Sequence, residues 1–63
     1  MPLTNVHVRL IGRNGNCYVI LSAVKDALIK AGYPDLAKRY VEEATKGDYD
    51  NLLRVTMEYV EVD

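Results

Sequence analysis

The chain has 63 residues, of which 49% are hydrophobic and 27% are charged. This length fits a single domain, which we place at residues 1–63. Eight basic residues against nine acidic ones give a net charge of −1. Because no basic surplus is left to hold a phosphate backbone or an anionic lipid surface, we predict neither a nucleic-acid partner nor a membrane partner.

The apolar residues are not arranged as in a membrane or secreted protein. The longest uninterrupted apolar run covers only residues 17–21, whereas a membrane-spanning helix needs about 20 residues. No secretory signal is visible at the amino terminus, and the single cysteine cannot form an intramolecular disulfide. These features predict a soluble, cytoplasmic protein.

The first predicted element is a strand over residues 5–11. Val6, Val8 and Leu10 alternate with residues that would point the other way, which is typical of a strand buried on one face. Residues 12–16 follow with the sequence Gly-Arg-Asn-Gly-Asn. An Asn-Gly pair favours positive φ angles, so we predict a tight turn there.

A helix is predicted from the cap Asn16 to Gly32, which we expect in the C′ position. Its apolar stripe has the spacing i, i+3, i+4, i+7 and consists of Cys17, Ile20, Leu21, Val24, Leu28 and Ala31. Val19, Ala23 and Ile29 lie off this stripe and are also apolar. We therefore expect this helix to be covered on two sides.

Two further helices and a strand complete the prediction. Pro34 suits the first turn of the second helix, which Gly47 would end as its C′ residue. Asp48 would cap a third helix over residues 49–58, followed by a short strand over residues 59–62. The expected buried stripes are Leu36, Ala37, Tyr40, Val41 and Ala44 in the second helix, and Leu52, Leu53, Thr56, Met57 and Val60 in the third. The fold class is α+β, in the order β-α-α-α-β.

The size of the chain predicts self-association. A domain of about 60 residues buries only about 60% of the surface that its unfolded chain exposes. Two short strands also form a sheet with two open edges and little stability of its own. We therefore expect a homodimer, in which a second copy completes the fold.

Two segments carry a family resemblance. Residues 8–16 contain the pattern L-x-G-x-x-G-N, and residues 43–53 read E-A-T-x-G-D-Y-D-x-L-L. The chain thereby resembles a family of small uncharacterised proteins of bacteria and their phages, which carries no assigned activity. The resemblance implies an inhibitor or adaptor that binds a host or cellular protein. Relatives often have Ala and Phe where this chain has Cys17 and Tyr18, which speaks against a role for the thiol.

The turn at residues 12–16 is the candidate ligand site. The start of a helix that follows a strand can receive an anion on its free N–H groups. Candidate residues for a nucleotide or phosphorylated metabolite are Arg13, Asn14, Gly15 and Asn16, which follow Gly12. The segment does not complete a P-loop or a dinucleotide-binding pattern. A strand-to-helix turn with an Asn cap explains the same residues.

Other candidate sites have simpler structural explanations. Cys17 and His7 can be drawn as a nucleophile and its base, but Cys17 also opens an apolar stripe, so we expect a core thiol. Asp48 and Asp50 resemble the start of a calcium loop whose remaining ligands are missing. We predict no catalytic residue, no metal and no cofactor.

The five tyrosines are assigned to core or interface positions; they are Tyr18, Tyr33, Tyr40, Tyr49 and Tyr59. The leading hypothesis is a non-catalytic, homodimeric protein-binding module. The alternative is a small-ligand binder at residues 12–16.

Overall fold

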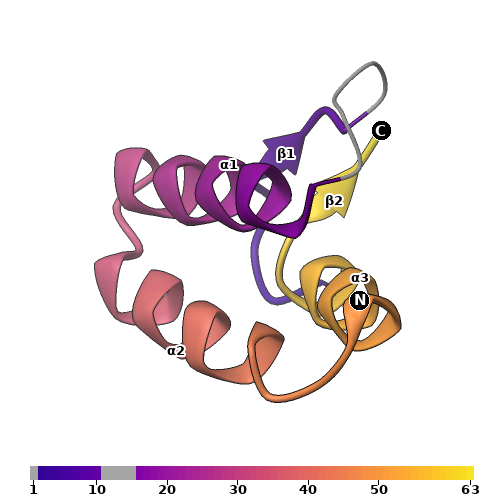
Figure 1. Cartoon of the computed structure of the whole chain (residues 1–63). Coiled ribbons are helices and arrows are strands. Elements are labelled where there is room, and N and C mark those ends of the chain that lie inside the picture. Colours follow the sequence, from indigo (N-terminus) through magenta and orange to yellow (C-terminus); the bar gives the residue numbers. More distant parts are fainter. Residues whose placement is uncertain (1, 11–15) are drawn as a thin grey trace.

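The computed structural model describes residues 2–10 and 16–63. The elements in chain order are β1 (His7–Val8), α1 (Cys17–Lys30), α2 (Pro34–Ala44), α3 (Tyr49–Tyr59) and β2 (Glu61–Val62). The predicted order β-α-α-α-β and the α+β class are confirmed. Figure 1 shows α1 and α2 running alongside each other, with α3 at one end of the pair and both strands behind α1.

Both ends of α1 follow from local chemistry. The Asn16 side chain accepts a hydrogen bond of 2.8 Å from the backbone N–H of Tyr18, which confirms the predicted cap. Beyond the carboxyl end, Gly32 has a φ of +93°, and the N–H of Tyr33 donates to the Leu28 carbonyl at 2.8 Å. This is the Schellman arrangement that glycine at C′ favours.

The carboxyl end of α2 differs from the prediction. The helix ends at Ala44 with Thr45 as its C-cap, so Lys46 and not Gly47 occupies C′. Gly47 has a steric role instead, because a Cβ there would lie 2.8 Å from the Cβ of Asn51. The glycine therefore allows the α2–α3 turn to approach the first turn of α3.

Helix α3 begins as predicted and ends later. Asp48 caps it by accepting 3.0 Å from the Asn51 N–H. The predicted strand over residues 59–62 is two residues too long, because Tyr59 still belongs to α3 and Val60 is its C-cap. The buried Tyr59 ring follows Val55 by four residues, so helical geometry keeps both side chains in the core. Only Glu61–Val62 forms β2.

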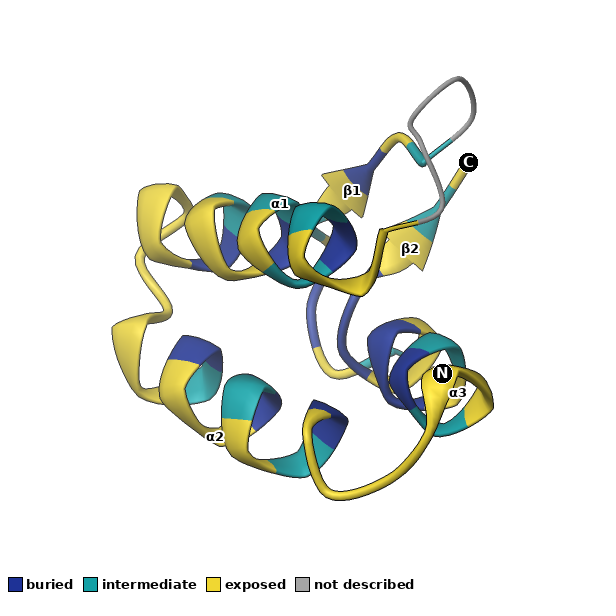
Figure 2. Ribbon diagram, in the orientation of Figure 1, coloured by how far each residue is buried: buried dark blue, intermediate teal, exposed yellow. Residues whose placement is uncertain are grey.

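The three helices enclose one hydrophobic core. Their buried faces turn toward one another and toward the strands (Figure 2). The buried apolar residues are Val8, Ile20, Val24, Leu28, Ala37, Tyr40, Ala44, Leu52, Val55, Tyr59 and Val60. Leu21, Leu36, Val41 and Leu53, which the stripes also include, are partly buried against this core.

Three predicted stripe residues lie outside the core, namely Ala31, Met57 and Cys17, which is described with the candidate site. Ala31 is exposed because α1 ends before it. Met57 is 59% exposed because the buried side of α3 passes through Val55, Thr56 and Tyr59. A residue two positions from both Val55 and Tyr59 falls on the opposite side of a helix with 3.6 residues per turn.

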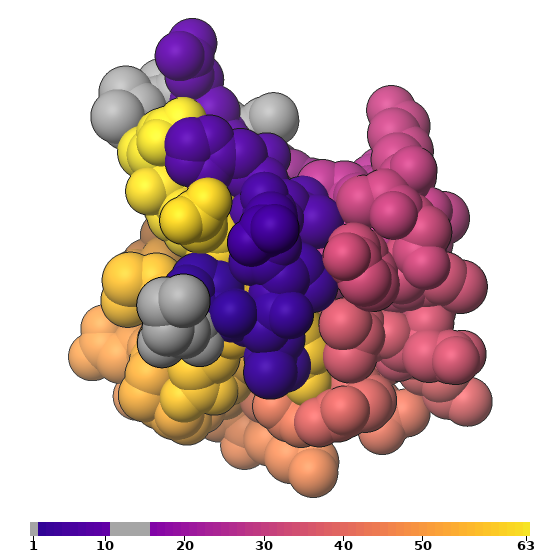
Figure 3. Space-filling view, turned by 180° about the vertical axis from the view of Figure 1, so that it is seen from behind, coloured from indigo at the N-terminus to yellow at the C-terminus, as the bar shows by residue number. Residues whose placement is uncertain are grey.

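The strands pair with each other in parallel, with His7 opposite Glu61 and Val8 opposite Val62. The amino-terminal segment runs beside the carboxyl-terminal residues across the back of the molecule (Figure 3). Val8 is buried, and β1 packs against α1 and β2. The apolar face of β1 is thus covered within one chain, so the predicted second copy is not needed to cover it.

Candidate functional site

Most of the predicted ligand site lies outside the described residues. Gly12, Arg13, Asn14 and Gly15 fall in that segment, and only Asn16 is described. Besides its side-chain bond to Tyr18, its carbonyl accepts the N–H groups of Val19 and Ile20 at 3.1 and 3.3 Å. Asn16 therefore satisfies the N–H groups of Tyr18, Val19 and Ile20, which an anion could otherwise use.

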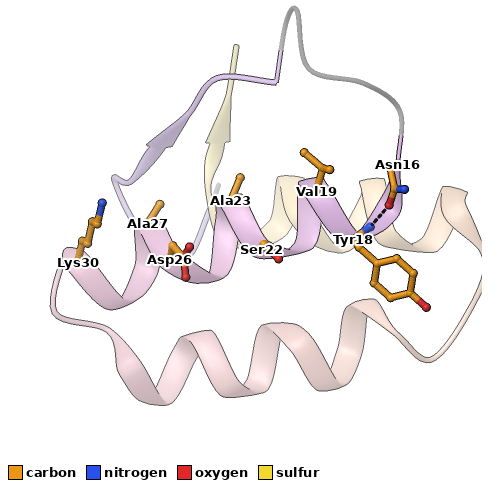
Figure 4. A pocket seen from close by; sticks show the side chains of 8 residues that line it. All are labelled: Asn16, Tyr18, Val19, Ser22, Ala23, Asp26, Ala27 and Lys30. Carbon is orange, nitrogen blue, oxygen red and sulfur yellow. Dashed lines mark hydrogen bonds between the residues drawn. The ribbon is translucent and has the colours of Figure 1, made fainter.

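A cavity of about 680 Å³ runs along one side of α1, starting at Asn16. Figure 4 shows Val19, Ala23 and Ala27 pointing to one side of the helix, while the ring of Tyr18 points to the other. All of its described lining residues belong to α1 or its cap; the polar ones are Asn16, Tyr18, Ser22, Asp26 and Lys30. The apolar Val19 and Ala23, predicted to need cover, are only partly buried.

Cys17 is exposed, so the predicted core thiol is wrong. It is the first residue of α1, and the closed core begins one turn later, at Ile20. Cys17 borders a cleft of about 290 Å³ between the start of α1 and the α2–α3 turn, whose wall includes Tyr49. His7 is not among the residues that line this cleft.

The imidazole of His7 instead faces the carboxyl-terminal acids. Its Nε2 lies 3.4 Å from an Asp63 carboxylate oxygen and 4.0 Å from one of Glu61. All three side chains are about half exposed. His7 thus lies beside the acids of β2 and the carboxyl terminus. This position gives no support to a nucleophile–base pair of Cys17 and His7.

The acidic pair at the start of α3 is explained by capping. The Asp48 carboxylate accepts from the N–H of Asn51, and Asp50 lies in the first turn, where the helix dipole favours a negative charge. Across residues 2–10 and 16–63, no three His, Cys, Asp or Glu side chains are grouped so that they could hold a metal ion.

Within residues 2–10 and 16–63, the titratable groups with shifted pKa values are two core phenols. Burial raises the pKa of the Tyr40 phenol above its ordinary 10.0. Burial also raises the pKa of Tyr59, with a further contribution from Glu43. The rings of Tyr40 and Tyr59 pack edge to face with centroids 5.5 Å apart. They serve the core, whereas Tyr18, Tyr33 and Tyr49 are exposed.

A groove between α1 and α2 is the candidate binding surface. Its volume is about 420 Å³, and its lining residues are Leu21, Ser22, Lys25, Ile29, Pro34, Ala37, Lys38, Val41 and Glu42. Ile29 is 46% exposed at its edge. The lining combines apolar side chains with three charged ones, Lys25, Lys38 and Glu42.

The groove was only partly visible in the sequence. In the sequence, Ile29 is an apolar residue off the main stripe of its helix, whereas Leu21 and Val41 fit the predicted core stripes. Both are partly buried in the structure and also line the groove. The sequence feature that indicates the groove is the wide apolar side of α1. One hydrophobic core does not cover all of its residues.

Among the described residues, no helix is long and apolar enough to cross a membrane. Comparisons with protein families, with curated proteins and with solved structures found no match to this chain. The resemblance to a family of small bacterial and phage proteins stays a prediction.

Proposed function

We propose that the protein is a non-catalytic protein-binding module that acts as a homodimer. The observation that carries the proposal is the groove between α1 and α2, where Ile29 stays 46% exposed beside Leu21 and Val41. Leaving such side chains in water forgoes about 25 cal/mol for each Å² of apolar surface, so covering the groove favours association.

The partner to which we commit is a second copy of the chain. The groove lining carries both signs of charge, with Lys25 and Lys38 against Glu42. A surface that presents both signs can be complementary to itself, as a two-fold interface requires. The host or cellular protein that such a dimer would bind stays a prediction from the sequence.

The supporting experiment compares sedimentation of the wild type with that of Ile29→Lys. Ile29 lies in the last turn of α1, where a lysine suits the helix dipole, so this variant should fold. Tyr49→Lys is the matched control, because Tyr49 is 42% exposed and does not line the groove. We expect the wild type and Tyr49→Lys to be dimers and Ile29→Lys to be a monomer. A monomeric wild type would overturn the proposal.

The alternative function, a small-ligand binder at residues 12–16, is not favoured by any contact of the described residues. Asn16 is committed to capping α1. A thermal shift with a panel of nucleotides, compared between the wild type and Arg13→Ala, tests that alternative separately.

A further inference from the structure

We propose that the dimer is built by α2 of each copy lying antiparallel in the groove of the other, with Lys38 of one copy facing Glu42 of its partner. The inference rests on the proposed function, because it names the surface through which the homodimer forms. It also fixes the symmetry, since a two-fold axis would pass the middle of α2.

The first support is the spacing of the two charges. Lys38 and Glu42 are four residues apart, exposed, and both line the groove. Four residues correspond to about 6 Å along a helix, and side chains at this spacing share a face. When two such helices run antiparallel about a point midway between these residues, each lysine is level with the partner's glutamate. Two reciprocal ion pairs result, as an isologous interface requires.

The second support is the apolar content of the same face. Val41 is only partly buried and lies next to Glu42 in the groove, so it would come close to the two-fold axis. Across the groove, Leu21 and the exposed Ile29 belong to α1. A partner's α2 in the groove would cover the apolar residues of both helices. The packing would resemble a four-helix arrangement with a buried apolar centre and charged margins.

The remaining charge in the groove favours only the Glu42 side of each pair. Lys25 stands on the α1 side, so each groove carries two lysines and one glutamate. A partner's Glu42 finds two lysines of opposite sign there, whereas its Lys38 finds only Glu42, so the reciprocal Lys38–Glu42 pairs are needed to balance the charges. The Arg39–Glu43 pair of α2, 4.0 Å apart, is absent from the groove lining and needs no partner from the second copy.

The test uses two charge reversals, Lys38→Glu and Glu42→Lys, each examined alone and then mixed in equal amounts. Each variant alone would place like charges opposite each other at two positions. At low salt we expect each reversal to weaken self-association about tenfold or more. The mixture should regain wild-type affinity as a heterodimer, because its two pairs are again of opposite sign. Lys46→Glu changes the net charge by the same amount as Lys38→Glu, lies outside the groove, and should leave the dimer unchanged.

The mixed sample separates an interface effect from a folding effect. A reversal that merely damaged α2 would not be rescued by a second damaged chain, and circular dichroism of each variant gives its helix content. A wild-type dimer whose two reversals leave affinity unchanged, or whose mixture fails to re-associate, would overturn this arrangement and leave the homodimer standing. A wild type that stays monomeric would overturn both.

Discussion

The hydroxyl groups of Tyr40 and Thr56 lie 2.7 Å apart in the centre of the core and join α2 to α3. The Thr56 hydroxyl has a single proton, which it donates to the Leu52 carbonyl at 2.8 Å. Tyr40 must therefore be the donor to Thr56. Both residues are fully buried, so the pair satisfies two polar groups that water cannot reach.

Substituting either residue of this pair should destabilise the protein, and the loss should be smaller for Tyr40 than for Thr56. Tyr40→Phe deletes the donor and should lower the free energy of unfolding by about 0.5–1.5 kcal/mol. Thr56→Val leaves the buried Tyr40 hydroxyl without its acceptor, which should cost about 1–3 kcal/mol. Urea denaturation followed by circular dichroism measures both values.

The double variant is the control for this pair. Because the two residues share one hydrogen bond, their effects should add to less than the sum of the single losses. Strict additivity would show that the Tyr40–Thr56 bond contributes nothing to stability.

Tyr59 gives the opposite expectation for the same substitution. Its hydroxyl is buried and makes no hydrogen bond of standard geometry among the residues described, although Glu43 is near enough to contribute to its raised pKa. Tyr59→Phe should leave the free energy of unfolding unchanged or raise it by up to about 1 kcal/mol, because it removes an unsatisfied polar group. Tyr40→Phe is the matched reference in the same denaturation series. A loss for Tyr59→Phe as large as for Tyr40→Phe would reveal a stabilising partner for this hydroxyl.

The buried phenols also predict the response to alkaline pH. The pKa values of Tyr40 and Tyr59 are raised in the folded state above the ordinary 10.0. Above pH 10 the unfolded chain loses these protons while the folded chain keeps them, so stability falls as the pH rises. Thermal unfolding in steps from pH 8 to pH 11 should show a declining melting temperature. The double variant Tyr40→Phe, Tyr59→Phe should decline less steeply, and an identical decline would contradict this account.

The helix boundaries were the most predictable part of the fold. Asn16, Gly32 and Asp48 each satisfy backbone groups within a few residues of themselves, so local sequence is enough to predict them. Gly47 was assigned the wrong role because its constraint comes from the side chain of Asn51. A glycine required by a close approach looks the same in the sequence as one required by a positive φ.

Burial at the ends of the stripes was less predictable. Cys17 fits the spacing of the α1 stripe but lies one turn before the closed core. Met57 fits a stripe that continues from Leu53 at a spacing of four residues, but the buried side of α3 runs through Val55, Thr56 and Tyr59 instead. Periodicity specifies which side of a helix is apolar. How much of that side is buried depends on where the neighbouring helices end.

The candidate site could be predicted only as a surplus of apolar residues. Ile29 stood out in the sequence because it lies off the main stripe, but its place at the edge of a groove depends on how α2 packs against α1. Of the predicted ligand residues, Asn16 is a helix cap. The other three, Arg13, Asn14 and Gly15, lie outside the described part of the chain.

Sedimentation equilibrium of the wild-type chain over a range of concentrations tests the proposed homodimer most directly. The account predicts a mass that rises with concentration from 7.1 kDa to twice that value and then levels off, as a closed two-fold assembly requires. A mass of 7.1 kDa at every concentration would contradict it, and so would growth beyond two copies.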